Sequence, residues 1–557
     1  MEDHGQFSVL DYSFFVVVFV LSAGIGLYYA IKSRNKDVTI EEYLLGGRNM
    51  SLLPVSCSVI ATSISASTIV GLASEVYAYG TYSWLFSYGV FFMAIVSSTV
   101  FLPVFHELKL TSSFKYFELR FNRNVRLLAS GLFILTGLIY LSVTIYIPAL
   151  TFQQVTGVNI YITVVILSVL CACYTAVGGF KAVVWTDVVQ LFLILSSVVI
   201  IIVIGIRSVG GFDKVYNAAD RGGRIYFFKT DNMNSRTSFL STFLSTSFVC
   251  NYQFGLNQAN LQRFLSLSNL KKTRLSVLFL AITFISVIIL SQVLGAIIYA
   301  NYETCDPVKA GTIKRFDQVL PFFIQEKASL FFGFNGIFVA GMFSASLSTT
   351  SSYLNAMSGI IYEDFISHRY PDISDKVANK IMKSTVLILG IVQIASVFLV
   401  ERMGLINQMA TQSLALNTAA LLTLFILGVL VPKANSKGAM AGAFAAIGSL
   451  LILIIGSINY KSEPTLPFRT DGCENPPTEN YSNSTLSALD FTDTSDTHWP
   501  FKLNFTYYGF TGPTVGLIVG CLTSWLTGGH RVTNEKLLAP FLRHKSRPEE
   551  EIRLQDT

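Results

Sequence analysis

The sequence predicts an all-α polytopic membrane protein, and its composition and the placement of its charges support this. The chain has 557 residues, of which 52% are apolar and only 13% are charged, and its mean hydropathy is +0.54. An ordinary soluble domain carries roughly a quarter charged residues. All 40 Lys and Arg residues lie outside a set of long apolar stretches. Most of these stretches reach the ~20 residues that a helix needs to cross the hydrocarbon layer.

These stretches predict about thirteen transmembrane helices, in an order that also defines the loops. The second and third are separated only by the turn at 77–82. The predicted spans are 11–31, 52–80, 82–104, 127–152, 159–178, 184–206, 239–262, 275–300, 330–362, 384–400, 405–431, 439–459 and 508–527.

The orientation of the chain follows from the charges of the loops. With the amino terminus outside, the loops assigned to the cytoplasm and the carboxyl tail hold 26 Lys and Arg, against 14 in the outside segments. Cytoplasmic loops normally carry this excess. The three Asn-x-Ser/Thr glycosylation acceptors, Asn480, Asn483 and Asn504, all lie in the loop 460–506, which the charge rule places outside. We therefore predict an extracellular amino terminus and a cytoplasmic carboxyl terminus.

Five of the seven cysteines lie in or beside predicted spans, where a thiol packs as a small apolar group. Cys305 and Cys473 are the two in predicted outside loops. That setting is oxidising, so they could form a disulfide. The sequence leaves open whether they do.

Missing motifs exclude several classes of membrane protein. The chain has no Walker-type Gly-rich loop and no room for a cytoplasmic nucleotide domain, which an ATP-driven pump needs. All six His residues fall in predicted loops or tails, and none could ligate a catalytic metal within the membrane. We therefore expect neither an enzyme nor a nucleic-acid partner, and read the net charge of +6 as a sign of topology.

Two predicted spans carry dense hydroxyl groups at membrane depth. Residues 62–68 hold five Ser or Thr side chains, and residues 344–352 hold seven. Helical spacing places Ala345, Ser348, Thr349 and Ser352 on one face. A single Ser or Thr usually serves close helix packing. Clusters of this density instead indicate a site for a hard cation such as Na⁺, which hydroxyls and freed backbone carbonyls can ligate.

The predicted span 239–262 is also polar, with amide side chains from Asn251 to Gln258. Amides are costly in hydrocarbon unless they have partners, so they either bond neighbouring helices or line a cavity. Gly255 gives this span a candidate break point.

Counting the spans predicts an internal symmetry. Five spans occupy 52–206 and five occupy 239–431, and an odd number of crossings orients the two groups oppositely. Transporters with inverted repeats bind substrate beside the interrupted first helix of each repeat. The remaining segments are 1–51 with the first helix, the outside loop 207–238, the region 432–527 with two further helices, and the cytoplasmic tail 528–557.

Several further segments carry distinctive motifs. They are Gly46–Met50, Ala61–Gly80, Ala176–Asp187 with its Gly-Gly-Phe-Lys-Ala run, Asn257–Gln258 with Gln262–Arg263, Cys305–Pro307, Asp317–Pro321 and Ala434–Gly438. These motifs resemble those of the sodium:solute symporter family, in particular its branch of sodium-coupled monocarboxylate, multivitamin and iodide transporters. The similarity extends from about residue 10 to residue 530.

The resemblance implies a LeuT-like fold with a five-plus-five core and a set of site residues. The Na⁺ site would use backbone carbonyls of Ala61, Ile64 and Ala345 and the hydroxyls of Ser348 and Thr349. Asp187 would pair with a neighbouring basic residue. The substrate region would fall on Ser63, Ser67, Thr68, Tyr140, Cys250 and Gln253.

The expected function is therefore Na⁺-coupled uptake of a small solute at the plasma membrane by alternating access. The expected solute is a small organic monoanion such as a monocarboxylate. The substrate windows hold no Lys or Arg, which suits a singly charged anion or a neutral solute better than a dianion. A multivitamin or iodide-type transporter is an alternative. A transport-inactive sensor or a channel is another, since 419–423 lacks the Gly and Pro usual in the family, which predicts a straighter, stiffer helix.

Overall fold

A computed structural model describes residues 8–33, 38–227, 239–328, 333–402, 406–457, 465–473, 505–529 and 534–543. Over these ranges the chain is helical, and no β-strand forms. The helices of the amino-terminal half are α1 (Val9–Ser33), α2 (Ile40–Leu45), α3 (Leu52–Ser63), α4 (Ala66–Tyr79), α5 (Phe86–Val96), α6 (Leu102–Leu108), α7 (Lys115–Arg120), α8 (Arg123–Thr156), α9 (Ile160–Val209) and α10 (Phe212–Arg221). Those that follow are α11 (Phe239–Cys250), α12 (Gln258–Leu265), α13 (Leu270–Asn301), α14 (Val319–Ala328), α15 (Phe334–Ile360), α16 (Asp375–Arg402), α17 (Ile406–Leu430), α18 (Ser436–Gly456) and α20 (Tyr508–Leu526).

Within the described ranges, eight helices are long and apolar enough to cross a membrane, or nine if the bent pair α3–α4 counts as one span. Within the described residues, each of the predicted apolar stretches is largely helical, but not every one passes such a test. α15 carries its many hydroxyls, and the predicted span 239–262 is divided between α11 and α12. Length and apolarity alone therefore find fewer spans than the sequence pattern predicts.

The predicted connection at 179–183 is very short. α9 runs from Ile160 to Val209, but Gly179 has non-helical angles, φ 62° and ψ −162°, and divides it into two helical segments. A positive φ suits glycine, which has no Cβ. Ala182 and Val183, which follow, are apolar and buried, so the helix resumes at once. The predicted spans 159–178 and 184–206 thus correspond to two helical segments of α9 that meet at Gly179. The segments fold back on one another, since Cys171 and Tyr174 of the first interact electrostatically with Asp187 of the second.

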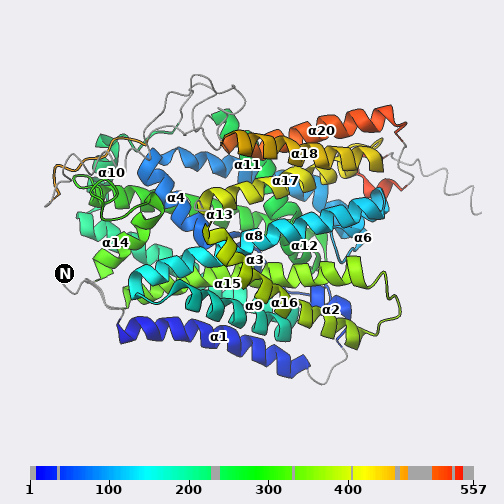
Figure 1. Ribbon diagram of the computed structural model, residues 1–557, viewed down its shortest axis with the longest axis horizontal. Helices are drawn as coiled ribbons and strands as arrows, with labels where there is room; N and C mark the ends of the chain where they lie inside the picture. The colour runs from blue at the N-terminus through cyan, green and yellow to red at the C-terminus, as the bar shows by residue number, and fades with distance from the viewer. Residues whose placement is uncertain are drawn as a thin grey trace, which may run out of the picture.

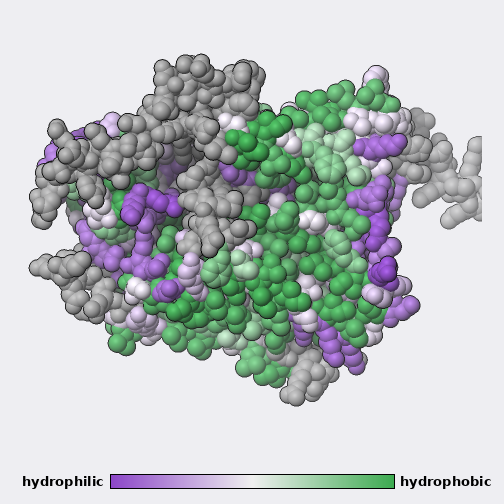
Figure 2. Space-filling model, in the orientation of Figure 1, coloured by the Kyte–Doolittle hydropathy of each residue, from purple (hydrophilic) through white to green (hydrophobic). Residues whose placement is uncertain are grey.

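The segments predicted for the two sides of a membrane separate to opposite ends of the molecule. Figure 1 shows α10 and α14, from predicted outside segments, at one end, and α2 and α6, from the predicted cytoplasmic side, at the other. Figure 2 shows apolar side chains across the middle of the visible face, with hydrophilic residues toward both ends. This distribution is that of a helical bundle crossing a bilayer.

The carboxyl-terminal helices α18 and α20 pack closely through small residues. A Cβ added at Gly442 of α18 would lie 2.7 Å from the Gly516 carbonyl oxygen of α20, and one added at Gly516 would lie 2.8 Å from the Gly442 carbonyl oxygen. The spacing of Gly438, Gly442 and Ala446 is the small-xxx-small pattern that lets membrane helices approach. The pair packs against α17, on the opposite side of the molecule from α1 (Figure 1).

Cys305 and Cys473 form a disulfide, so the alternative that the sequence left open is resolved. The bridge holds the segment 466–473 over the carboxyl end of α4. There the Leu466 N–H donates to the Ala78 carbonyl at 3.0 Å, and the Phe468 ring stacks on Tyr77 with centroids 5.1 Å apart. Arg224 is fully buried beside them, its guanidinium 4.6 Å from the Phe468 ring centroid.

Candidate functional site

The predicted span 52–80 is broken at membrane depth. α3 ends at Ser63, α4 begins at Ala66, and the two helices are bent by 53°. Ile64 and Ser65 between them are extended, with ψ of 101° and 161°. The last carbonyls of a helix have no partner within it, so the end of α3 presents free backbone oxygens. The Ser65 hydroxyl caps α4 by accepting from the Thr68 N–H at 3.3 Å.

The hydroxyl-rich helix α15 lies against this break. It is buried along nearly its whole length, and Ala345, Ser348 and Thr349 are each 0% exposed. The Thr349 hydroxyl donates to the Thr62 carbonyl at 3.2 Å and to the Ala345 carbonyl at 3.1 Å. The Thr62 and Ser352 hydroxyls lie 2.9 Å apart. Residues almost 300 positions apart in the chain thus bring helix-end carbonyls and hydroxyls together, the donor set that suits Na⁺.

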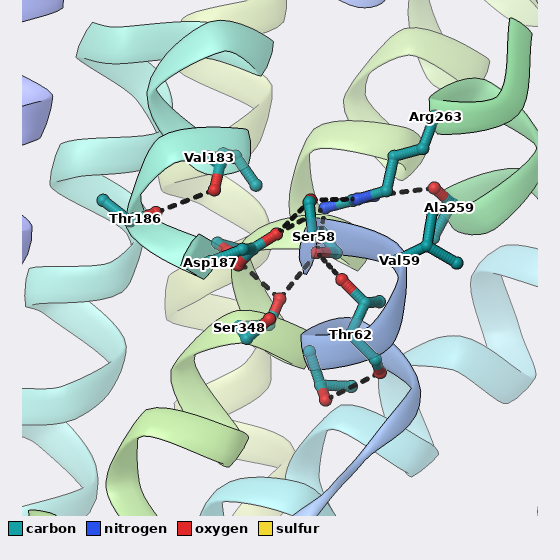
Figure 3. Close-up of polar contacts among 12 residues, drawn as sticks. Ser58, Val59, Thr62, Val183, Thr186, Asp187, Ala259, Arg263 and Ser348 are labelled. Atoms are coloured by element: carbon teal, nitrogen blue, oxygen red, sulfur yellow. Dashed lines mark hydrogen bonds and ion pairs between the residues drawn. The ribbon is translucent and has the colours of Figure 1, made fainter. Parts of the chain in front are cut away.

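A buried ion pair lies beside this contact (Figure 3). The Arg263 guanidinium of α12 is 3.0 Å from the Asp187 carboxylate of α9. Ser58 of α3 bridges them, since it accepts from Arg263 at 2.6 Å and donates to Asp187 at 2.5 Å. Arg263 also donates to the Ser352 hydroxyl, and Ser348 interacts with Asp187. The pairing expected for Asp187 is formed, and it links α3, α9, α12 and α15.

The predicted substrate residues gather partly around the break. Ser63 donates to the Val59 carbonyl at 2.7 Å, and the hydroxyls of Ser67 and Thr68 lie 2.7 Å and 3.0 Å from the Ser65 hydroxyl. Tyr140 of α8 interacts with Ser65. Four of the predicted residues therefore come from the end of α3, the start of α4 and the facing side of α8.

The other two predicted substrate residues, Cys250 and Gln253, lie where the predicted span 239–262 is interrupted. Cys250 is buried at the end of α11, directly before a π-helical turn over Asn251–Leu256. Gln253 lies in this turn, and α12 starts after Asn257, which has an extended ψ of 133°. The break thus falls two residues after Gly255. A Cβ at Gly255 would be 2.1 Å from the Ser97 hydroxyl oxygen, so the turn packs where only glycine fits.

Two residues that the sequence analysis missed connect these groups. Tyr353 of α15 donates weakly to Gln253 at 3.5 Å, and its ring centroid lies 5.5 Å from that of Tyr140. Asn417 of α17 accepts from Tyr252 at 3.3 Å. Tyr353 follows Thr349 by four positions, so helical spacing from the predicted cation residues was a signal that could have found it. Nothing in the sequence pairs Asn417 with the π-helical turn.

One further prediction is confirmed, and another falls on residues that the structure does not describe. α17 is continuous from Ile406 to Leu430, as the absence of Gly and Pro in 419–423 predicts. The glycosylation acceptors Asn480, Asn483 and Asn504 lie outside the described residues.

Known proteins are similar to this chain in sequence and in fold. The model of the sodium:solute symporter family matches residues 43–446. The chain belongs to this family. It is 33% identical to human sodium-coupled monocarboxylate transporter 1, over 98% of this chain and 95% of that protein. It is 32% identical to a rabbit (Oryctolagus cuniculus) sodium-dependent multivitamin transporter, over 96% and 85% of the two chains.

Solved structures place the chain of this symporter-family member in the LeuT-type fold. A Na⁺-coupled sialic acid symporter in a substrate-bound outward-open state matches with a TM-score of 0.74 and 22% identity, over 95% of this chain and all of the other. Mhp1, a nucleobase-cation-symport-1 family transporter, matches with a TM-score of 0.50 and 10% identity, over 90% and 98%. The all-helical fold predicted from the sequence is confirmed.

Proposed function

We propose that this protein couples inward Na⁺ flow to the uptake of a small organic monoanion, most simply a monocarboxylate, across the plasma membrane. The observation that carries this proposal is the contact between the broken helix α3–α4 and the hydroxyls of α15. Family membership and the named activity of the sodium-coupled monocarboxylate relatives support it. The chain's amino terminus would face outward and its carboxyl terminus the cytoplasm.

The transported Na⁺ would bind between α3 and α15. Its ligands would be the backbone carbonyls of Ala61, Ile64 and Ala345 and the hydroxyls of Ser348 and Thr349. These five oxygens provide hard, uncharged donors, and two of them come from the unwound end of α3. A cation shared by the two helices would stabilise the arrangement in which they touch. Coupling needs such a difference in affinity between two conformations.

The solute would bind nearby, at Ser63, Ser67 and Thr68, with Tyr140, Cys250 and Gln253 around it. The start of α4 adds positive potential, because the first N–H groups of a helix point at an anion. The Gln253 side-chain nitrogen is buried and has no hydrogen-bond acceptor within the described residues, so it could donate to a carboxylate. Arg263 is engaged by Asp187 and is not available for this role. This set of donors favours one negative charge over two.

The energetics favour more than one Na⁺ for each anion. A membrane potential of about 70 mV contributes about 1.6 kcal/mol for each inward Na⁺. A tenfold Na⁺ gradient contributes about 1.4 kcal/mol more. An inward monoanion opposes the field at a cost of about 1.6 kcal/mol, so one Na⁺ concentrates it only about tenfold. Two Na⁺ leave about 4 kcal/mol, and we expect a stoichiometry of at least two.

Uptake measurements test the proposal directly. Cells that express the chain at their surface would be given labelled lactate, pyruvate, pantothenate, biotin or iodide, in Na⁺ or in choline medium. We expect Na⁺-dependent accumulation of a monocarboxylate. Preference for biotin and pantothenate, or for iodide, would assign the alternative substrates instead. No Na⁺-dependent uptake of any of these solutes would leave a sensor or channel on this scaffold, which the continuous helix α17 favours.

Substitution of the two hydroxyl ligands tests the cation site. Ser348→Ala with Thr349→Ala should raise the Na⁺ concentration for half-maximal uptake about tenfold or more, since each lost ligand is worth about 1 kcal/mol or more. Thr350→Ala is the matched control, because Thr350 is equally buried on the same helix and its hydroxyl has no partner within the described residues. An unchanged Na⁺ requirement in the double variant would remove this assignment.

A further inference from the structure

A second pocket lies at the end of the molecule predicted to face the cytoplasm, away from the candidate transport site. It has a volume of about 70 Å³ and is partly open to solvent. Four elements meet there: the end of α1, α2, the kink of α9 and the start of α16 (Figure 1). Its lining includes Tyr29, Glu42, the segment 177–181, Asn379 and Lys383.

The charge of this pocket is positive. Lys181 and Glu42 line it and neutralise one another through an ion pair of 2.6 Å. Lys383 is a further cation in the lining, and no carboxylate within the described part of the chain lies in ion-pair distance of its ammonium. Lys32 adds a third lysine beside the wall, since its ammonium is 5.9 Å from the centroid of the Tyr29 ring. The lining therefore suits an anionic group.

An apolar stripe on α9 leads into the same pocket. α1 packs on one side of α9, where a Cβ at Gly26 would be 2.9 Å from the Tyr174 Cβ. α16 packs on the other side, where a Cβ at Gly390 would be 2.8 Å from the Ala172 Cβ. Cys173 and Val177 lie between these two contacts and are exposed. Exposed residues follow one another along this face of the helix: Ile162, Ile166, Val169, Cys173 and Val177. The four aliphatic side chains among them are between 48% and 56% exposed.

We propose that the pocket and the stripe together bind an anionic phospholipid of the cytoplasmic leaflet. The phosphate lies at Lys383, and an acyl chain lies along the stripe between α1 and α16. Basic pockets between membrane helices on the cytoplasmic side are suited to such head groups. Val177 belongs both to the stripe and to the pocket lining, so one molecule can occupy both. The lipid would touch the Gly179 kink, where Tyr43 of α2 is 3.0 Å from the position of an added Cβ.

Lipid binding to the purified full-length protein tests this site without reference to transport. Dioleoyl phosphatidylserine or dioleoyl phosphatidylcholine would be titrated into the detergent-solubilised protein, and adducts counted by native mass spectrometry. We expect preferential binding of phosphatidylserine and a loss of about fivefold in its affinity in Lys383→Gln. Lys271→Gln, at an exposed lysine on the same predicted side, should leave the affinity unchanged.

The stripe is tested separately. Val177→Phe should weaken phosphatidylserine binding by filling the acyl path, whereas Ile282→Phe, at a lipid-facing position of α13 that is 56% exposed, should not. Equal binding of the two lipids, or equal losses in Lys383→Gln and Lys271→Gln, would overturn the proposal. So would competition by water-soluble glycerophosphoserine as strong as that by the lipid, because the ligand would then be a free phosphate compound.

Discussion

At the scale of single residues, the Asp187–Arg263 pair is the clearest case in which removing one side chain should be worse than removing both. Their side chains are 0% and 1% exposed. A buried charge that loses its partner costs about 3–5 kcal/mol. We expect Asp187→Asn or Arg263→Gln alone to destabilise the fold by about this amount, and the double variant to lose clearly less than the sum. Thermal unfolding of the purified variants measures both effects.

A more exposed pair provides the control for this prediction. The Lys181 and Glu42 side chains are 35% and 37% exposed, so their ion pair should contribute less than about 1 kcal/mol. Lys181→Gln should therefore lower the unfolding temperature much less than Arg263→Gln. Additive losses in the Asp187–Arg263 double variant would show that the two charges do not stabilise one another.

A second prediction for a single residue concerns Glu363, in the turn after α15. Burial and the neighbouring Asp364 carboxylate together raise the pKa of Glu363 to about 7, against the lowering effects of Thr111, Arg126 and Lys115. The folded protein therefore holds a proton that the unfolded chain releases near pH 4.3. Between these pH values, the free energy of unfolding falls as pH rises.

Glu363→Gln should remove this part of the pH dependence. The unfolding temperature of the wild-type protein should drop relative to that of Glu363→Gln as the pH is raised from about 5 to 7.5, and the difference should level off above that. Asp213→Asn, at an exposed carboxylate of α10, is the control. Parallel curves for the wild type and Glu363→Gln would contradict the raised pKa.

At the scale of secondary-structure elements, the sequence predicted the composition of the site better than its connections. The hydroxyls of 62–68 and 344–352 were visible because Ser and Thr are dense where hydrocarbon side chains are expected. The bend between α3 and α4 leaves no such mark, since Ile64 and Ser65 are ordinary residues in extended geometry. The partner of Asp187 could not be chosen from sequence either, because Arg263 lies 76 residues away and reaches it through the packing of α12 on α3 and α15.

The pairing of α18 with α20 depends on glycine at the contact. Gly442→Val should destabilise the protein by about 1–3 kcal/mol, because its side chain would meet the Gly516 carbonyl, which is backbone and cannot move aside alone. Gly448→Val on the same helix is the matched control, since an added Cβ there meets nothing within 4 Å. Thermal unfolding of the two variants tests this prediction. Equal losses of stability would show that valine destabilises α18 wherever it is introduced, and not through the contact with α20.

At the scale of the whole molecule, hydropathy and charge predicted an all-helical membrane protein, and the fold bears this out. They also predicted separate spans at 159–178 and 184–206, and these correspond to the two segments of α9 that meet at Gly179. The sequence did not show how short the connection is, since a glycine with a positive φ can join two helical segments almost directly. The predicted loops gather at two ends of the molecule because of the way the helices pack together, so this grouping is seen only in the folded structure (Figure 1).

This separation leads to a prediction about orientation that does not depend on transport. If the loop 460–506 faces outward, glycans on Asn480, Asn483 and Asn504 should make the expressed protein shift on a gel after glycosidase treatment, and replacing all three by Gln should abolish the shift. An epitope tag added after Thr557 should be stained by antibody only after the cells are permeabilised. Staining of the tag in intact cells would show that the carboxyl terminus faces outward, the reverse of the predicted orientation. The basic pocket at α2 and α16 would then face the outer leaflet, which carries little anionic lipid to bind there.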